Sequence, residues 1–482
     1  MQADLVVVAL YLAAVLAIGG VFARGQRSLK EFFLAGRSIP WWAAALSGMA
    51  TMMSAVGYLG APGQAYAGDW RYLQMRLAVL PALLIAGFLV LPFFHRLEVY
   101  TAYEYLERRF DRRTRLLAAV LFLLLKLFYT GVAIYAPALV VAEMTGWPLL
   151  WVVLGIGALT TLYTTLGGIR AVIWTDALQM VVLTAGIVLA LWLVITRVEG
   201  GFGGIVSTAM AAGKMHFFDW SLDPTVEFTV WNGIVGGTFY LVSQYAVDQA
   251  EIQRFLTTKS VSGCRRAMVW SLLANAVLGV VLFFVGTALW VFYQQHAPGE
   301  AIQPDRVFPK FILEEIPAGL RGLLIAGVFA AAMSTVSSIL NSLAAVVVRD
   351  LRTFREDDAH TGMAWARYAT FAAGAGATAL SLYTAQLGNV LVAAGKIRGF
   401  FGGVLVGLFL LGMLSRRATG FGAFWGVIVG FVGVSLMAAY TPISWLWYTA
   451  FATVCTYGAG EVLSRRDPAP ERAKLEGLVW KP

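Results

Sequence analysis

The sequence predicts an all-α, polytopic membrane protein, and three observations lead to this fold class. Hydrophobic residues make up 59% of the 482 positions and charged residues only 13%, whereas soluble domains carry about 25% charged residues. Apolar runs of about 18 to 27 residues, long enough to cross a bilayer as a helix, recur along the whole chain. Because a helix satisfies its own backbone polar groups in lipid, each run is expected to be helical.

We expect about thirteen transmembrane helices, one for each of the apolar runs. The first run carries Asp4, lacks a basic leader and is too long for the core of a cleavable signal peptide, so we expect it to persist as a helix. The runs are 4–23, 41–66, 76–97, 116–143, 147–167, 172–196, 228–249, 267–294, 321–348, 364–384, 388–413, 418–439 and 443–463.

Two of these runs, 41–66 and 228–249, are interrupted by glycines and polar residues. Interrupted helices at matching positions of an inverted repeat are typical of secondary transporters, which bind their substrate near the bilayer midplane. The two runs lie five spans apart, and an odd offset turns the second set upside down relative to the first. Glycine is also common in membrane helices in general, but the spacing favours the repeat.

The chain is therefore expected to be one transmembrane transporter domain, 1–482, with a five-plus-five inverted-repeat fold. An extra N-terminal helix at 4–23 precedes a first repeat at 41–196. A second repeat at 228–413 is followed by two C-terminal helices at 418–463.

The net charge of +9 is distributed as in a membrane protein and not as in a nucleic-acid-binding protein. Under the positive-inside rule the basic loops lie in the cytoplasm. This places the N-terminus outside and the C-terminus in the cytoplasm of a cell whose inner or plasma membrane holds the protein. The basic residues gather in alternate loops, at 24–30, 96–115, 259–266, 349–355, 416–417 and 465–466.

Several classes of function are disfavoured. The chain has two cysteines and four histidines, without metal-ligand spacing, and no phosphate-binding GxxxxGK[ST] loop. No His, Cys or paired-carboxylate cluster that could act as a catalytic centre converges in the sequence, so we expect neither an enzyme nor an organic cofactor.

The run 321–348 carries a stripe of hydroxyl groups. Residues three and four apart share a helix face, so Ala331, Ser334, Thr335 and Ser338 lie together. Hard cations such as sodium bind oxygen ligands. Serine and threonine also let membrane helices pack closely, so the stripe alone leaves both interpretations open.

Six stretches of the chain carry distinctive motifs, among them Asp-Gln-Ala-Glu-Ile-Gln-Arg at 248–254 and Ser-Thr-Val-Ser-Ser-Ile-Leu-Asn at 334–341. The other four stretches are 50–62, 103–110, 129–138 and 167–176. In sequence and in order, the six stretches resemble the sodium/solute symporter family, and most closely its branch of sodium-coupled monocarboxylate, multivitamin and iodide transporters.

The resemblance implies a main sodium site between the broken first core helix and the eighth. Its ligands would be the backbone carbonyls of Ala50, Met53 and Ala331 and the hydroxyls of Ser334 and Thr335. An unwound turn independently frees carbonyls that need partners, which a cation can supply.

A second sodium site is implied at Asp176, with Ser337 and Ser338. Asp176 lies six residues beyond Arg170, about 9 Å into its helix. A carboxylate at the bilayer centre costs about 2.5–3.5 kcal/mol on insertion scales and somewhat less at this depth, so a partner is expected. An aspartate near a helix start, favoured by the dipole, and proton coupling through Asp176 are the alternatives.

Three basic residues favour an anionic substrate. Lys126 lies about 16 Å beyond Arg115, near the bilayer centre, where it could contact substrate, snorkel or pair with Asp176. Lys396 and Arg398 lie early in the tenth core helix, where sugar-transporting relatives contact substrate, or alternatively at the outer interface. The remaining candidate substrate residues are Met52, Val56, Gly57, Tyr58, Gln74, Tyr129, Gln244 and Tyr245.

These observations predict a sodium-coupled symporter that imports a small organic solute, most simply a monocarboxylate or similar small anion, by alternating access. Val56 and Gly57 would leave a sugar's hydroxyls without hydrogen bonds. The alternatives are a sodium-coupled carrier of amino acids, vitamins or sugars, a proton-coupled carrier, and a channel. The expected partners are the lipid bilayer, sodium and the solute. The sequence predicts no oligomeric state.

Overall fold

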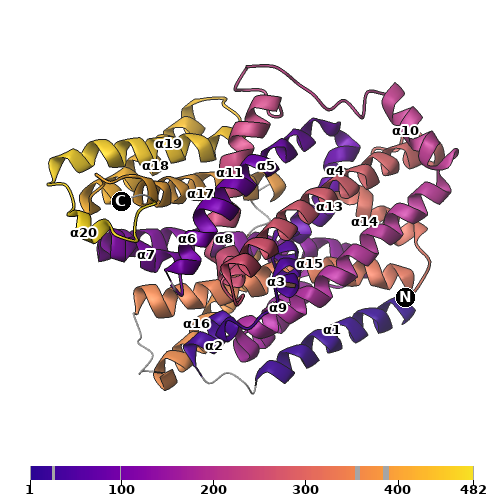
Figure 1. The fold of residues 1–482 in the computed structure, drawn as a ribbon. Coiled ribbons are helices and arrows are strands. Elements are labelled where there is room, and N and C mark those ends of the chain that lie inside the picture. Colours follow the sequence, from indigo (N-terminus) through magenta and orange to yellow (C-terminus); the bar gives the residue numbers. More distant parts are fainter. Residues whose placement is uncertain (1, 24–27, 98, 353–358, 384–389, 481–482) are drawn as a thin grey trace.

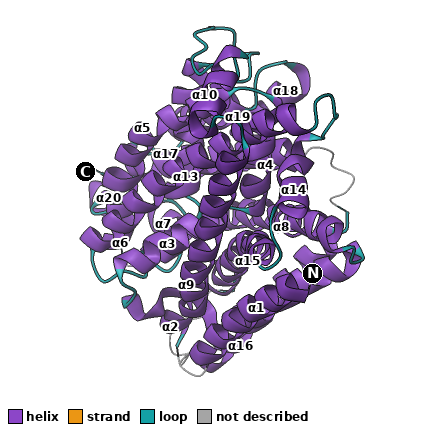
Figure 2. Cartoon of the chain, turned by 90° about the vertical axis from the view of Figure 1, so that its right-hand side faces the viewer, coloured by secondary structure: helices purple, strands orange, loops and turns teal. Residues whose placement is uncertain are grey.

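The computed structural model describes residues 2–23, 28–97, 99–352, 359–383 and 390–480. In these ranges the chain consists of helices joined by loops, with no strand (Figure 2). The helices of the first half are α1 Gln2–Ala23, α2 Leu29–Leu34, η1 Ala35–Arg37, α3 Trp41–Met52, α4 Ala55–Ala67, η2 Trp70–Ala78, α5 Val79–Leu83, η3 Leu84–Val90, α6 Leu91–Arg96, α7 Ala102–Arg109, α8 Arg112–Thr145, α9 Leu149–Arg197 and α10 Gly201–Ala211.

The second half repeats this pattern of long helices and short irregular turns. Its helices are η4 Asn232–Gly236, α11 Gly237–Ala246, α12 Gln249–Phe255, α13 Val261–His296, α14 Pro304–Glu315, α15 Leu320–Val346, η5 Val347–Leu351, α16 Ala359–Ser381, α17 Val390–Leu414, α18 Gly420–Tyr440, α19 Leu446–Leu463, η8 Ser464–Arg466 and α20 Arg472–Leu475.

The all-α prediction is confirmed, and each predicted run overlaps one helix or a series of helices. Among the described residues, seven helices are long and apolar enough to cross a membrane, or eight if the bent pair α3–α4 forms one span. The count of thirteen spans stays a prediction, as do the boundaries of the two repeats.

Two of the predicted runs, 147–167 and 172–196, are separated by a kink and not by a loop. Both lie in α9, where two helices meet at Gly168, whose backbone angles are not helical (φ 55°, ψ −159°). A Cβ at this position would lie 2.8 Å from the carbonyl oxygen of Phe32. Glycine therefore provides both the unusual backbone angle and the room for α2 to approach.

Helix α15 runs through the interior of the bundle, with α1, α3, α8, α9 and α16 packed around it (Figures 1 and 2). All its residues from Leu324 to Val346 are buried. The hydroxyl stripe on this helix therefore faces protein on every side and not lipid.

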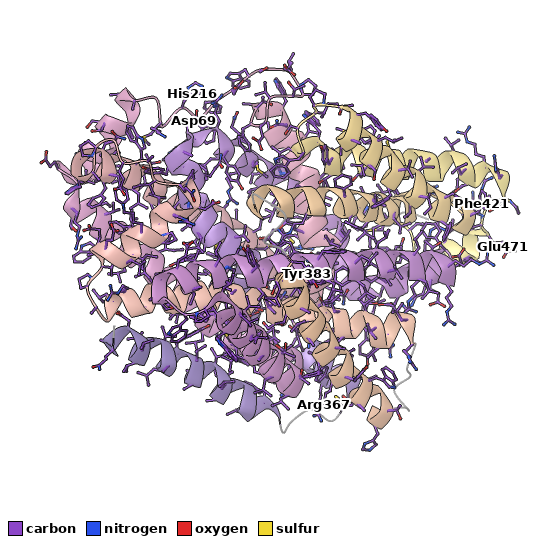
Figure 3. All side chains as sticks on the ribbon, turned by 180° about the vertical axis from the view of Figure 1, so that it is seen from behind. Asp69, His216, Arg367, Tyr383, Phe421 and Glu471 are labelled. Atoms are coloured by element: carbon purple, nitrogen blue, oxygen red, sulfur yellow. The ribbon has the colours of Figure 1, made fainter. Side chains whose placement is uncertain are left out.

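Helices α17, α18 and α19 pack together on one side of the molecule, and the two termini lie on opposite sides (Figure 1). Figure 3 shows Asp69 and His216 at one end and Phe421 and Glu471 at the other. The side of the membrane on which each of these segments lies stays a prediction.

Candidate functional site

The first element of the site is a break in the second predicted span. Helix α3 ends at Met52, Met53 leaves the helical conformation (φ −80°, ψ 69°), and α4 starts at Ala55. The Ser54 side chain accepts a hydrogen bond from the amide of Gly57 and so caps α4. The two helices meet at an angle of 59°, and carbonyls in the last turn of α3 lose their helical partners.

The hydroxyl stripe of α15 faces this break. The Ser334 hydroxyl donates to the carbonyl oxygen of Ala50 at 2.9 Å and lies 3.3 Å from that of Ala331. The Thr335 hydroxyl lies 3.2 Å from the carbonyl oxygens of both Thr51 and Ala331. Two hydroxyl and three carbonyl oxygens from segments about 280 residues apart therefore form one buried cluster.

This cluster offers oxygen atoms of the kind that hard cations bind. Hard cations bind oxygens at about 2.3–2.6 Å, so ligands at right angles around one ion lie about 3.4 Å apart. The hydrogen-bonded oxygen pairs of the cluster are 2.9–3.3 Å apart, which is close to that spacing. Simple helix packing does not require carbonyls freed by a break.

Four of the five predicted sodium ligands, Ala50, Ala331, Ser334 and Thr335, meet in this cluster. The fifth, Met53, is the residue at the break itself. The carbonyl that contacts Thr335 belongs to Thr51, which sequence reasoning did not single out.

A second polar cluster lies beside the first. Asp176, on α9 and fully buried, accepts a hydrogen bond from Ser47 at 2.6 Å and one from Ser338 at 3.4 Å, both at Oδ2. Its Oδ1 has no hydrogen-bond partner among the described residues. Arg254 on α12 lies 3.6 Å from Asp176 and donates to both Ser47 and Ser338.

The structure brings Asp176 and Ser338 together as predicted, but it gives Ser337 other contacts. The Ser337 hydroxyl donates to the carbonyl of Ser334 at 3.1 Å and also contacts Tyr163. The Thr51 and Ser338 hydroxyls share a hydrogen bond of 2.9 Å. This hydrogen bond links the Asp176 cluster directly to the break.

A cavity of about 190 Å³ adjoins the break. Seven of the eleven predicted substrate residues line it: Met52, Val56, Gly57, Tyr129, Gln244, Tyr245 and Arg398. Arg398 donates to Gln244 at 2.9 Å, and its guanidinium carbon lies 4.0 Å from the centre of the Tyr129 ring. The cavity therefore has aromatic and apolar walls with a guanidinium held in place on one side.

Two further predicted substrate residues have contacts elsewhere. Tyr58 is fully buried and packs edge-on against Phe308 of α14, at 5.6 Å between ring centres. The side-chain amide of Gln74 forms hydrogen bonds with backbone groups. It donates to the carbonyl oxygens of Arg71 and Phe228 and accepts from the backbone amide of Asp219.

Lys126 forms an ion pair with Asp248, and this pair replaces the suggested contact with Asp176. Asp248 lies between α11 and α12, where it caps α12 by accepting from the amide of Ala250. The ammonium lies 5.7 Å from the centre of the Tyr129 ring. Lys396 lies in α17, but its side chain falls outside the described residues.

Sequence reasoning missed several residues of the site. Arg254 belongs to the stretch 248–254, but its pairing with Asp176 links positions 78 residues apart and leaves no local pattern. Ser47 and Thr51 are four residues apart on α3 and so share one helix face. This spacing could have indicated a polar face on α3. Arg76 and Glu227 line the cavity, and both lie near span ends where charged residues are common.

Comparison with known proteins was consistent with this geometry. Residues 32–430 match the sodium:solute symporter family. The sodium/sialic acid symporter NanT of Aliivibrio fischeri is 32% identical over 454 residues, which cover 92% of this chain and 89% of that protein. Sodium-coupled monocarboxylate transporter 1 of Xenopus laevis is 35% identical over 437 residues, covering 88% and 69%.

A solved structure also matches nearly the whole chain. It is described as a substrate-bound, outward-open state of a Na⁺-coupled sialic acid symporter with a novel Na⁺ site. The TM-score is 0.89 at 30% identity, and the match covers 98% of this chain and 99% of that one. The family resemblance inferred from the motifs is therefore confirmed, while the relatives carry two different kinds of substrate.

Proposed function

Because the chain belongs to the sodium:solute symporter family, we propose that it imports a small organic anion, most simply a monocarboxylate, together with sodium. Sodium binds where the break after α3 meets α15, and the anion binds in the adjoining cavity. The single observation that carries the anion assignment is Arg398, whose guanidinium lines that cavity without an ion-pair partner among the described residues.

The oxygen cluster supports the sodium assignment. It joins α3 to α15 through Ala50, Ser334 and Thr335, so an ion there stabilises one arrangement of the broken helix against the central helix. Met52 and Met53 line the substrate cavity. Sodium binding therefore orders a wall of the substrate site, which is the basis of coupling in this proposal.

Charge and size support a small anion. A guanidinium within a membrane protein needs an opposite charge or a polar partner. Arg398 contacts Gln244 and Tyr129 and lies near Asp248, but Asp248 is already paired with Lys126. The volume of about 190 Å³ lies below the roughly 300–1,000 Å³ of pockets for drug-sized ligands. A short carboxylate matches both properties.

Sialic acid is the second candidate, because relatives that cover nearly the full chain are sodium/sialic acid symporters. Sialic acid is also a carboxylate, but it is a far larger molecule with many hydroxyls. Val56 and Gly57 in the cavity wall offer those hydroxyls no side-chain hydrogen bonds. We therefore place it after the short carboxylates.

The orientation follows from the basic loops. We propose that the protein lies in the inner or plasma membrane with its N-terminus outside and its C-terminus in the cytoplasm. The repeats at 41–196 and 228–413 then form the two halves that rock against each other around the sodium and substrate sites.

Uptake into proteoliposomes tests the proposal. Purified protein is given a sodium gradient, a proton gradient or neither. The solutes are short monocarboxylates, sialic acid, iodide, pantothenate, proline and glucose. We expect saturable, concentrative carboxylate uptake only with sodium. Uptake of neutral solutes alone, or of sialic acid alone, contradicts the substrate assignment, and uptake that never exceeds equilibrium indicates a channel.

The variant Arg398→Gln tests whether the guanidinium of Arg398 binds the anion. Loss of a charge-assisted contact should raise the KM for a carboxylate about ten- to hundredfold, with little change in the sodium concentration that gives half-maximal rate. Arg306→Gln is the matched control, because Arg306 pairs with Glu143 at a site outside the cavity. An unchanged KM in Arg398→Gln contradicts the role of Arg398.

A further inference from the structure

A second guanidinium lines the same cavity from a different element. Arg76 lies at the end of η2, whereas Arg398 lies on α17. Tyr72 of the cavity wall is close enough to both guanidinium groups to interact with each electrostatically. Two positive charges therefore act on one small volume within the membrane protein.

The guanidinium of Arg76 lies in a space provided by a glycine. A Cβ added at Gly279 of α13 would lie 2.1 Å from Nη2 of Arg76. Gly279 itself lines the cavity. Any larger residue at 279 would push the guanidinium away, so the glycine makes the present position of the charge possible.

Among the described residues, no side chain pairs with Arg76. Within the described ranges its side chain makes no hydrogen bond and no ion pair. The carboxylate of Glu227 is the one that the described residues contribute to the cavity lining; it is exposed and accepts from the Trp445 indole at 2.8 Å. An unpaired guanidinium in a membrane protein is a functional candidate by default.

The charges of the lining determine which ligand balances them. Arg76, Arg398 and Glu227 together carry a net charge of plus one, which a monoanion neutralises. A single carboxylate held by Arg398 leaves the donors of Arg76 without an acceptor. A neutral hydroxyl or carbonyl oxygen on the same ligand fills this need, because guanidinium groups are donors only.

We propose that Arg76 is a specificity-determining residue that binds a second, neutral oxygen acceptor of the substrate. The favoured ligand is a short monocarboxylate that bears a hydroxy or oxo group, with its carboxylate at Arg398. This inference rests on the proposed anion import. It adds a preference among carboxylates that Arg398 alone does not create.

The test compares ligands that differ only in the second acceptor. Sodium-driven uptake of propionate, lactate, pyruvate and malonate is measured in proteoliposomes. We expect lactate or pyruvate to have a KM about tenfold or more below that of propionate, and malonate to be weaker than either because of its second negative charge. Equal KM values for propionate, lactate and pyruvate overturn the proposal.

Two variants separate Arg76 from the rest of the site. Arg76→Gln should raise the KM for lactate and pyruvate about tenfold or more and so remove the preference for the hydroxy and oxo acids over propionate. Gly279→Ala displaces the same guanidinium without removing it and should have the same effect. Gly155→Ala is its control, because a Cβ at Gly155 meets open space.

The outcomes distinguish this inference from the proposed function. If the wild-type protein imports no carboxylate with sodium, the proposed function fails. If it imports carboxylates but Arg76→Gln keeps the full preference, only the role of Arg76 fails. Elution of each variant as a single species in detergent, with an unfolding temperature close to that of the wild-type protein, shows that both are folded.

Discussion

At the scale of single residues, the sodium proposal depends on where two hydroxyls point. Ser334 and Thr335 are adjacent on α15, and both contact carbonyls at the end of α3. Both are almost completely buried. A buried hydroxyl needs only one acceptor, and each of these two has a local one in Ala331, so the contacts to α3 exceed what burial requires.

We expect Ser334→Ala and Thr335→Ala each to raise the sodium concentration for half-maximal uptake about tenfold or more, because each removes a ligand of a charged ion. Ser342→Ala is the matched control, since its hydroxyl is also buried on α15 but donates only to the local carbonyl of Ile339. The measurement is uptake against sodium concentration. A normal sodium dependence in both variants would remove the assignment.

Asp176 leads to a second prediction at this scale. Asp176→Asn keeps an acceptor for Ser47 but removes the charge beside Arg254. If Asp176 holds a second sodium ion, the Hill coefficient for sodium should fall from near two to near one. Arg254 then retains Glu251 at 3.6 Å as a carboxylate partner, so the variant should still fold.

Two further measurements on Asp176→Asn separate a folding defect from a change in sodium stoichiometry. The variant should elute as a single species in detergent, and it should retain sodium-dependent uptake through the main site. A Hill coefficient of two in this variant would mean that Asp176 binds no sodium and that Arg254 is its permanent partner.

Spacing rules predicted the residue contacts that arise within one helix, and missed those between distant segments. The face shared by Ser334, Thr335 and Ser338 follows from helical periodicity. The partner of Lys126 does not, because Asp248 lies 122 residues later in the chain. Depth in the membrane indicated that Lys126 needs a partner, and only the tertiary structure identifies it.

At the scale of elements, the Lys126–Asp248 pair joins the long helix α8 to the turn between α11 and α12. Val247 there leaves the helical conformation (φ −130°, ψ −10°), and Asp248 starts α12. Removing one partner of a buried ion pair leaves an uncompensated charge and costs about 3–5 kcal/mol. The pair therefore fixes the position of this turn relative to α8.

We expect Lys126→Met to lower the thermal unfolding temperature in detergent markedly, because Asp248 is left charged and unpaired. The double variant Lys126→Met with Asp248→Asn should restore most of the loss, since asparagine is neutral and can still cap α12. If the double variant remains as unstable as the single one, the ion pair is not what stabilises the turn.

The same double variant decides the open role of Lys126. If Lys126 binds the substrate directly, the change Asp248→Asn cannot compensate for its loss, and the double variant should keep a raised KM for the substrate. We expect a KM within about twofold of the wild-type value, because Lys126 is already neutralised by Asp248 and does not line the cavity.

The elements themselves were predictable where hydropathy alone determines them. The break at Met53 was expected from polar residues inside an apolar run, and the structure places it there. The boundary between the runs 147–167 and 172–196 was expected too, and the kink at Gly168 lies between them. The sequence did not predict that the two helices meet directly, because a glycine at a kink and a glycine in a loop look alike in sequence.

At the scale of the whole molecule, the buried helix α15 connects the ion site to the substrate cavity. It contacts α3 on one side and α8, which carries Tyr129, on the other. The Asp176 cluster shares Ser338 with the same helix. Both candidate ion sites therefore contact one helix. The number of sodium ions that they bind determines the charge moved in each transport cycle, and so how strongly the membrane potential drives transport.

The charge carried in each cycle gives the last prediction. One sodium ion with a monoanion moves no net charge, whereas two sodium ions move one positive charge inward. A potential of 100 mV then supplies about 2.3 kcal/mol, or roughly fiftyfold accumulation without any sodium gradient.

We expect vesicles with equal sodium on both sides and an inside-negative potassium diffusion potential to accumulate the anion. Asp176→Asn should abolish this accumulation while uptake driven by a sodium gradient persists. Potential-independent uptake by the wild-type protein would instead indicate a single sodium ion, at the break between α3 and α4.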